Sequence, residues 1–347
     1  MSGRLKLRRG VVVDADPLTV EVDGERRRAW ADETLLGEMR EGDEVVVNVA
    51  ALDLGLGSGG FDVVHVNLTR GLRADPAGEA HVMKLNYSSL QHPVEPVELP
   101  VRLSNRMGGK VAPEEGEGAM PVLVLPLHGH LAPAAWAATQ ASPGLKLGYV
   151  QTAGGALPGS LSRDVAELRE RGLLCAHLTA GPAYGGEHEA LSVAGALDAA
   201  GSLGWDAALV GPGPGIVGSE SRLGHGGMAA LDNAHAALAL GLPTLLSPRL
   251  SESDPRDRHR GVSHHTLTVL EMLLGKVTVP VPNANPEVAA KLTEAVGDRH
   301  ELTEATPDLT GYRASGLPVR TMGRKIEQDA LFFAAPLAAG AALRGEE

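Results

Sequence analysis

Cysteine and aromatic residues are scarce in this chain. Of its 347 residues one is cysteine and 3% are aromatic, whereas glycine is abundant. The single Cys175 excludes an intrachain disulfide and a thiolate metal cluster. Because Cys175 stands in an apolar run, residues 173–178, we expect its side chain to be inert and buried. The core must then consist mainly of leucine, valine and alanine.

Long apolar runs are also missing. The most apolar stretch, residues 330–343, is short for a membrane span and contains Pro336 and Gly340, so it predicts a packed C-terminal helix. No apolar segment follows the basic residues near the N-terminus, and we therefore expect no signal peptide. These features favour a cytoplasmic protein without a membrane partner.

Cations are outnumbered by anions. The formal net charge is −12, from 31 lysines and arginines against 43 aspartates and glutamates. A nucleic-acid backbone requires a clustered positive surface, so a nucleic-acid partner is disfavoured. The charge does not exclude a homo-oligomer.

The length suffices for two domains. Residues 1–107 carry β-branched runs separated by turns, and Asp23-Gly24 fits a tight hairpin. This spacing predicts a small antiparallel β-barrel or sandwich. Residues 108–120 are rich in glycine, proline and glutamate, and we expect a linker there.

Apolar runs alternate with helical patterns in residues 121–347. The runs predict strands at residues 121–127, 146–151, 173–178, 206–210, 243–247 and 277–281. The patterns predict helices at residues 134–141, 161–171, 187–203, 228–240, 264–274 and 286–296. The alternation is typical of an α/β domain with a largely parallel, doubly wound sheet.

Unusual polar loops follow most of the predicted strands. Ligands of such sheets bind beyond the carboxyl ends of the strands. The loops expected there begin at His128, Thr152, Thr179, Gly211 and Ser251. We therefore expect one cleft at that edge.

His128 and His130 stand two residues apart at the end of a predicted strand. On an extended chain both imidazoles would point to the same side, as in metal-dependent hydrolases. If the protein binds a divalent metal, these are the expected ligands. The alternative is two histidines that are each hydrogen-bonded at the strand end.

Gly213, Gly215 and Gly218 match the spacing of a dinucleotide fingerprint. The prolines between them lack N–H donors, and no acidic residue ends the next strand, so we expect no standard nicotinamide site. A loop shaped for close backbone approach to another ligand is expected instead. His225 could reach that ligand, or it could cap the following helix.

Residues 251–265 concentrate arginine and histidine. Ser263 is expected to cap a helix that starts at His264. Free amides at a helix N-terminus attract anions, so Arg258, Arg260 and His265 are expected to bind a phosphate or carboxylate there.

Internal ion pairs offer another explanation for this loop. Asp254 and Asp257 could pair with Arg256 and Arg258 and hold the loop together without any ligand. Both interpretations remain open at this point.

Several motifs resemble a bacterial family, the domain-of-unknown-function family 3866. They are the segment His128-Gly-His-Leu-Ala-Pro, the segment Leu223-Gly-His-Gly-Gly, residues 254–265, the glycine loop after Asp53, and Met83-Lys-Leu-Asn-Tyr. The resemblance spans almost the whole chain. It implies no catalytic role for any residue.

The residues favour an enzyme, a hydrolase or group transferase, that acts on an anionic small molecule such as a phosphorylated one. Arg258 and Arg260 would hold the anion. Proton transfer or metal binding would fall to the histidines His128, His130, His259 and His264. The rival is a non-catalytic ligand sensor or nucleic-acid-associated adaptor that uses the β-rich domain, with a positive face formed by Arg4, Lys6, Arg8, Arg9 and residues 26–28.

Overall fold

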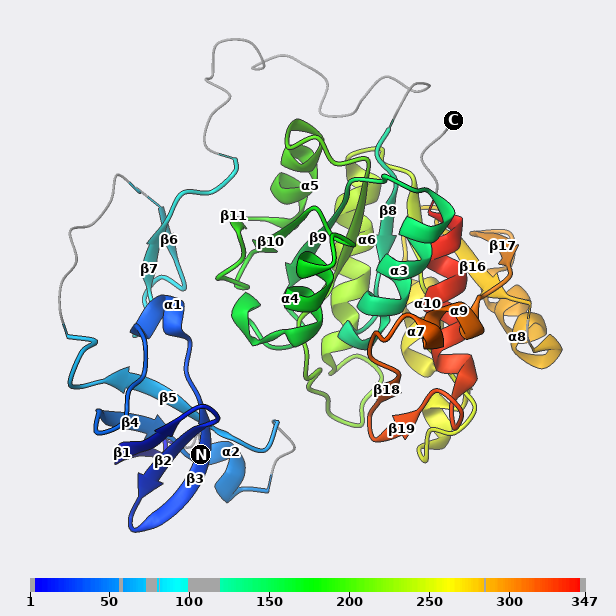
Figure 1. Cartoon of the computed structure of the whole chain (residues 1–347). Coiled ribbons are helices and arrows are strands. Elements are labelled where there is room, and N and C mark those ends of the chain that lie inside the picture. Colours follow the sequence, from blue (N-terminus) through cyan, green and yellow to red (C-terminus); the bar gives the residue numbers. More distant parts are fainter. Residues whose placement is uncertain are drawn as a thin grey trace, which may run out of the picture. The chain divides into compact units, whose positions relative to one another are not determined.

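The chain folds into two compact units, Met1–Ala80 and His81–Glu347. The computed structural model describes residues 4–55, 59–72, 80, 82–98, 119–283 and 285–343 (Figure 1). The linker expected at residues 108–120 lies outside the described residues, apart from its last two. The same holds for the centre of the glycine loop after Asp53.

The first unit contains a closed five-stranded barrel. Its strands are β1 (Leu7–Ala15), β2 (Leu18–Val22), β3 (Glu25–Trp30), β4 (Glu44–Asn48) and β5 (Asp62–Asn67), in the order β1-β2-β3-β5-β4. The β3–β5 pair is parallel and the other pairs are antiparallel. Two short helices accompany it, α1 (Glu33–Leu36) and α2 (Ala50–Asp53). The barrel prediction is confirmed.

Valines fill the barrel, as the alternating β-branched runs predict. Val20, Val45 and Val47 are completely buried. The expected hairpin turn forms at Asp23-Gly24, where both residues have positive φ, 53° and 81°. That conformation suits the twist of the strands that it joins.

Eight parallel strands form the sheet of the second unit. They are β8 (Val122–Val124), β9 (Leu147–Thr152), β10 (Ala176–Ala180), β11 (His188–Ala190), β12 (Ala207–Pro212), β13 (Thr244–Leu246), β16 (Thr278–Pro282) and β17 (Glu301–Ala305). Their order is β11-β10-β9-β12-β8-β13-β16-β17. Every residue of β9, β10 and β12 is buried, which explains why these strands are mainly apolar.

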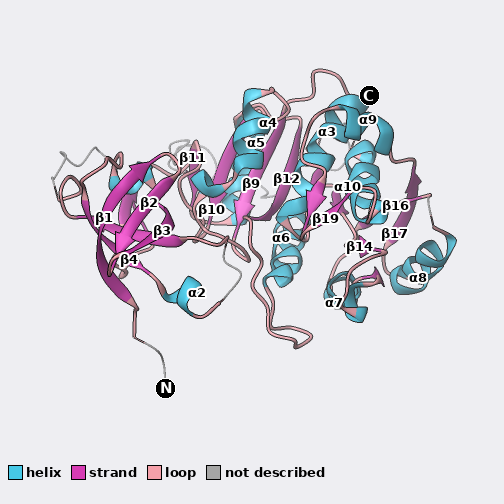
Figure 2. Ribbon diagram, turned by 60° about the horizontal axis from the view of Figure 1, so that its bottom comes forward, coloured by secondary structure: helices cyan, strands magenta, loops and turns pink. Residues whose placement is uncertain are grey.

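Helices cover both faces of this sheet (Figure 2). They are α3 (Leu131–Ala141), α4 (Arg163–Glu170), α5 (Val193–Ser202), α6 (Ala229–Ala239), α7 (His264–Met272), α8 (Pro286–Val296), α9 (Leu309–Ala314) and α10 (Ala330–Ala342). On β8, Leu123 packs in one apolar cluster with α3, α4, α9 and α10. Its neighbours Val122 and Val124 pack in a second cluster with α5 to α8. The predicted α/β fold is confirmed.

Three two-stranded sheets complete the second unit. They are formed by β6 (Val82–Lys84) with β7 (His92–Val94), β14 (Leu250–Ser251) with β15 (Gly261–Val262), and β18 (Arg320–Thr321) with β19 (Arg324–Lys325). In the first of them, the Lys84 ammonium donates to the backbone oxygens of Thr179 and Ala183 and pairs with Glu189. These contacts tie β6 to the end of β10.

Two local expectations are wrong. The helix expected at residues 187–203 starts only at Val193, because residues 188–190 form the edge strand β11 and the Ser192 side chain caps the helix. Cys175 is exposed rather than buried, because β10 begins one residue later. Partial desolvation still raises the pKa of its thiol.

The C-terminal helix packs as the sequence predicts. Residues 331–340 of α10 are buried, and α10 packs against α3. A Cβ on Gly340 would lie 2.2 Å from the backbone oxygen of Ala134, so only glycine permits this approach. Among the described residues, no helix has the length and apolarity needed to cross a membrane.

The all-parallel sheet brings the polar loops to one edge. The strand β8 lies between β12 and β13; from β8 the chain passes to β9 on one side, and from β13 it passes to β16 on the other. Doubly wound sheets bind ligands where the strand order reverses in this way. Hydrogen bonds join the loops at this point: His128 Nδ1 faces the oxygen of Pro212 at 3.3 Å, and His130 Nδ1 faces Ser247 Oγ at 2.9 Å.

Candidate functional site

Four histidines form a cluster beyond the carboxyl ends of β12 and β13. His225 precedes a 3-10 turn, residues 226–228, and His259 ends another, residues 257–259. His264 and His265 occupy the first turn of α7. The rings of His225 and His265 are stacked, with centroids 3.5 Å apart and planes at 6°. The sequence predicted a site role for each of the four residues, and the structure brings them together.

The ring of His264 closes the cluster. Its centroid lies 4.4 Å from that of His265, 5.0 Å from that of His259 and 5.6 Å from that of His225. His264 is half-buried, whereas the other three side chains are buried. His264 is therefore the member of the cluster that a solute reaches first.

Ser263 orients two of these histidines. Its hydroxyl accepts a hydrogen bond from the backbone N–H of His265, which is the predicted helix cap. The same oxygen lies 2.7 Å from Nδ1 of His259. Its own backbone N–H donates to the carbonyl oxygen of Arg249 at 3.0 Å. The hydroxyl of Ser263 thus makes both of these hydrogen bonds within the loop itself.

Two ring nitrogens of the cluster are buried without a partner among the described residues. Nε2 of His225 lies 2.9 Å from the carbonyl oxygen of Arg222. Since a carbonyl can only accept, Nε2 carries the proton and Nδ1 presents a lone pair. That Nδ1 atom and Nε2 of His264 have no hydrogen-bond partner. Both atoms are available to a ligand.

The environment keeps the cluster neutral. Burial is the main cause that lowers the pKa of His259, to about 3, and Arg249 and Arg256 lower it further. Burial also lowers the pKa of His264, with His225 and Arg258 as the next causes. The pKa values of His225 and His265 are likewise below the ordinary value, mainly because of burial. Near neutral pH these imidazoles are bases or ligands rather than cations.

Asp254 holds the arginine-rich loop together. Its buried carboxylate accepts from Arg256 at 2.9 Å and from Arg249 at 3.4 Å, and the guanidinium of Arg324 lies 3.7 Å away. Burial opposes ionisation of Asp254, but the hydrogen bonds from Arg256 outweigh it and the pKa lies below the ordinary value. The internal pairing of Asp254 with Arg256, one of the two interpretations of this loop, is present.

Arg258 and Arg260 lie on the surface of the same loop. Arg258 comes within 3.7 Å of Glu220, and Arg260 within 3.3 Å of Asp257. The expected pairing of Asp257 with Arg258 is therefore wrong. The guanidinium of Arg258 lies close enough to His264 to lower the pKa of that histidine. Arg260 instead lines a separate surface pocket.

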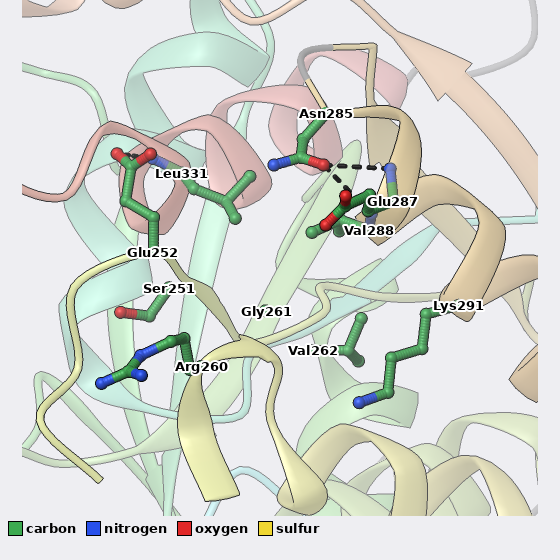
Figure 3. A pocket seen from close by; sticks show the side chains of 10 residues that line it. All are labelled: Ser251, Glu252, Arg260, Gly261, Val262, Asn285, Glu287, Val288, Lys291 and Leu331. Atoms are coloured by element: carbon green, nitrogen blue, oxygen red, sulfur yellow. Dashed lines mark hydrogen bonds between the residues drawn. The ribbon is translucent and has the colours of Figure 1, made fainter. Parts of the chain in front are cut away.

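Arg260 lines a pocket of about 270 Å³ between the β14–β15 hairpin and the N-terminal ends of α8 and α10 (Figure 3). Lys291 of α8 lines the same pocket. The carboxylates of Glu252 and Glu287 also belong to its lining. None of the four clustered histidines lines it, so the pocket and the cluster are separate features of one loop.

Two of the glycines after β12, Gly213 and Gly226, approach other backbone closely. A Cβ on Gly213 would lie 2.2 Å from the oxygen of Ala156, and one on Gly226 would lie 1.8 Å from the oxygen of Gly154. The loops after β9 and β12 are packed together in this way. Gly215 has a positive φ of 74°, and Gly218 forms a bridge with His225.

His128 and His130 do not point to a common position. The expectation of an extended chain is wrong, because the two residues lie in a 3-10 turn, His128–His130, after β8. Nε2 of His128 lies 2.7 Å from Ser162 Oγ, whereas His130 contacts Ser247. Burial lowers the pKa of His128 to about 4 and that of His130 to about 3.

Two buried cations, Arg249 and Lys84, were not predicted as site residues. Arg249 follows β13 and donates from Nη1 to Nδ1 of His265 at 3.3 Å. Burial lowers the pKa of Lys84, although its pairing with Glu189 opposes that effect. A basic residue within or directly after an apolar run is the signal that both positions share.

Metal binding is within the capacity of one group of side chains. His225, His264 and His265 each offer a ring nitrogen, and these atoms lie within 4.8 Å of one another. No carboxylate or thiolate belongs to this group in the described part of the chain. Three imidazole ligands are typical of zinc and of other late first-row metals.

The fold and the cluster define a class: a two-unit protein with a five-stranded barrel and a parallel α/β unit that carries histidines at its carboxyl edge. The chain belongs to the family described as "Protein of unknown function (DUF3866)", whose model matches residues 28–340. The resemblance noted in the sequence is thereby confirmed. No curated protein and no solved structure matches the chain.

Proposed function

We propose that the α/β unit is an enzyme, a hydrolase or group transferase, that acts on an anionic small molecule at the histidine cluster. One observation carries the proposal. Four imidazoles with lowered pKa values are grouped beside arginines at the position where doubly wound sheets bind their ligands. Perturbed titratable groups of this kind concentrate at functional sites.

The charge around the cluster favours an anion. Arg249, Arg256 and Arg258 all lower the pKa of His264, which means that the potential at this ring is positive. A positive potential in a partly buried site opposes protonation of the ring and attracts a negatively charged solute. Phosphate and carboxylate groups are the natural partners of guanidinium groups.

His264 is the best-placed base. It is half-buried, its pKa is lowered mainly by burial, and its Nε2 atom has no partner within the described residues. A neutral imidazole accepts a proton from an attacking hydroxyl or water and returns it to the leaving group. The ring of His259, held by its hydrogen bond with Ser263, packs against the ring of His264.

Anion binding to the full-length chain tests this proposal. Thermal denaturation would be followed with inorganic phosphate, a phosphate monoester series and a carboxylate series. A ligand at 100 times its Kd stabilises the folded state by about 2.7 kcal/mol. We expect Arg258→Ala to abolish the stabilisation, because its guanidinium lies near His264.

Two further variants sharpen the result. Arg313→Ala removes an exposed cation that pairs with Glu327 and should retain the full ligand effect. If only Arg260→Ala lost the ligand effect, the anion would bind in the pocket of Figure 3 rather than at the cluster. Unchanged stabilisation in both Arg258→Ala and Arg260→Ala would remove the anion site. Turnover of a responding phosphate ester that survives in His264→Ala would exclude His264 as the base.

A further inference from the structure

The three histidines that could share a ligand come from two separated segments. His225 belongs to the loop after β12, whereas His264 and His265 start α7. Their ring nitrogens lie within 4.8 Å of one another. The sheet order places β12 and β13 on either side of β8, so the fold brings together residues that are about 40 positions apart.

The ring of His225 is oriented like that of a metal ligand. Its Nε2–H donates to the carbonyl oxygen of Arg222, and its buried Nδ1 presents a lone pair that no described group satisfies. Metal-binding histidines almost always donate their second ring N–H to a carbonyl or carboxylate in this manner. Buried polar atoms without partners are costly, so two of them in one cluster indicate a missing ligand.

His265 holds its lone pair in one hydrogen bond, which a bound ion would replace. Its Nδ1 atom faces the guanidinium Nη1 of Arg249 at 3.3 Å, and since arginine only donates, this nitrogen is an acceptor. A Cβ on Gly227 would lie 2.9 Å from Nδ1 of His265 and 3.0 Å from Nδ1 of His225. Both Nδ1 atoms therefore border the position that a side chain on Gly227 would fill. The two rings are stacked 3.5 Å apart, so they would tilt out of parallel to place one ion in both ring planes.

We propose that His225, His264 and His265 bind one divalent transition-metal ion, with zinc as the best match. Three imidazole nitrogens and an open fourth position are typical of catalytic zinc sites. The inference deepens the proposed function, on which it rests only for the nature of the fourth ligand. With the ion bound, His264 would be a ligand, and the ion would take its place in activating the attacking hydroxyl or water. The ligands are uncharged and arginines lie nearby, so the ion would leave an excess of positive charge. An anionic oxygen of the substrate would balance that charge.

The neighbouring His128 and His130 are a poor alternative. Both are buried, and they contact different serines, Ser162 and Ser247. Both rings would have to give up these hydrogen bonds before they could share an ion, whereas in the cluster only His265 would lose one. A metal is therefore expected at the cluster rather than at this pair.

Zinc binding by the full-length chain tests the proposal. The metal-stripped protein would be titrated with Zn²⁺ against a chromophoric chelator, and metal content would be measured after dialysis. We expect one ion per chain in the wild type. Single substitutions His225→Ala, His264→Ala and His265→Ala should each weaken binding at least about 100-fold, since loss of an outer partner alone costs about 10- to 100-fold. His235→Ala, a histidine of α6 outside the cluster, should bind as the wild type does.

X-ray absorption of the zinc-loaded wild type provides a readout that needs no variant. We expect imidazole scattering from three nitrogens at about 2.0–2.1 Å. The proposal is overturned by less than about a tenth of an equivalent of bound metal in the wild type, well below the occupancy of a tight zinc site. It is equally overturned by a spectrum without imidazole, or by wild-type affinity in all three variants.

The outcomes separate the metal from the enzyme. If phosphate esters stabilise the chain and Arg258→Ala removes the effect, but no metal binds, only the metal inference fails. If zinc binds through the three histidines but no anion alters the stability or is turned over, only the proposed function fails.

Discussion

Acidification from pH 6.5 to pH 5 should destabilise the α/β unit, because His128, His130 and His177 are buried as neutral groups. Burial lowers the pKa of His128 and of His177 to about 4, and that of His130 to about 3. In an unfolded chain the pKa of each would be about 6.5. A base with a lowered folded pKa contributes stability above its unfolded pKa and loses it as the pH falls.

The magnitude follows from this difference in proton uptake. Between pH 6.5 and pH 5 each of these histidines passes from half to almost fully protonated in the unfolded chain, while it stays largely neutral in the folded one. The free energy of unfolding then falls by about 1.6 kcal/mol per histidine and by about 5 kcal/mol for the three. Such a loss rivals the whole stability of a domain, about 5–15 kcal/mol. Most carboxylates remain ionised in this interval.

Urea unfolding at a series of pH values, followed by the fluorescence of Trp136 and Trp205, would measure the loss. The amide variants His128→Gln and His130→Asn can keep the hydrogen bonds to the serines, but they cannot take up a proton. Each should reduce the loss by about 1.6 kcal/mol, while His235→Gln, at a partly buried histidine of α6, serves as a control. Stability that stays constant or increases between pH 6.5 and pH 5 would refute the reasoning, as would wild-type behaviour of both amide variants.

Further predictions concern the loop, the helix packing and the barrel. Asp254→Ala leaves Arg249 buried with its ion-pair partner removed and should lower the free energy of unfolding by about 3–5 kcal/mol in urea titrations; a loss below half that would contradict the pairing. Gly340→Ala forces α10 away from Ala134 and should cost about 1–3 kcal/mol in thermal melts, whereas an unaltered melt would contradict the close approach. The full chain should bind single-stranded RNA only weakly in anisotropy assays near physiological salt, because three cations of the barrel already pair with aspartates. Submicromolar binding would favour the adaptor.

The strands and helices were largely predictable because burial determines their residue pattern. Each predicted strand of the α/β unit overlaps an observed one, since strands that are buried on both faces are mainly apolar. The short edge strand at residues 188–190 was missed, because three partly polar residues carry no such pattern. Its pairing with β10 depends on residues that are distant in the sequence.

The site was predictable in its parts but not in its assembly. Ser263 and the helix start at His264 follow from local capping chemistry. The stacking of His225 on His265 depends on strand order, which local periodicity does not encode. The assumed extended chain at His128 failed because the strand β8 ends at Val124 and a tight turn follows.

The cap at Ser263 also determines in which direction the side chains of the first turn of α7 point. Successive residues of an α-helix are rotated by roughly 100° about its axis. If the helix began one position earlier or later, His264 and His265 would turn away from His225, although no side chain had been altered. An insertion or deletion of a single residue between His265 and Val269 would therefore rotate both histidines by roughly 100° relative to the buried part of α7 and dismantle the cluster, while leaving the eight-stranded sheet intact.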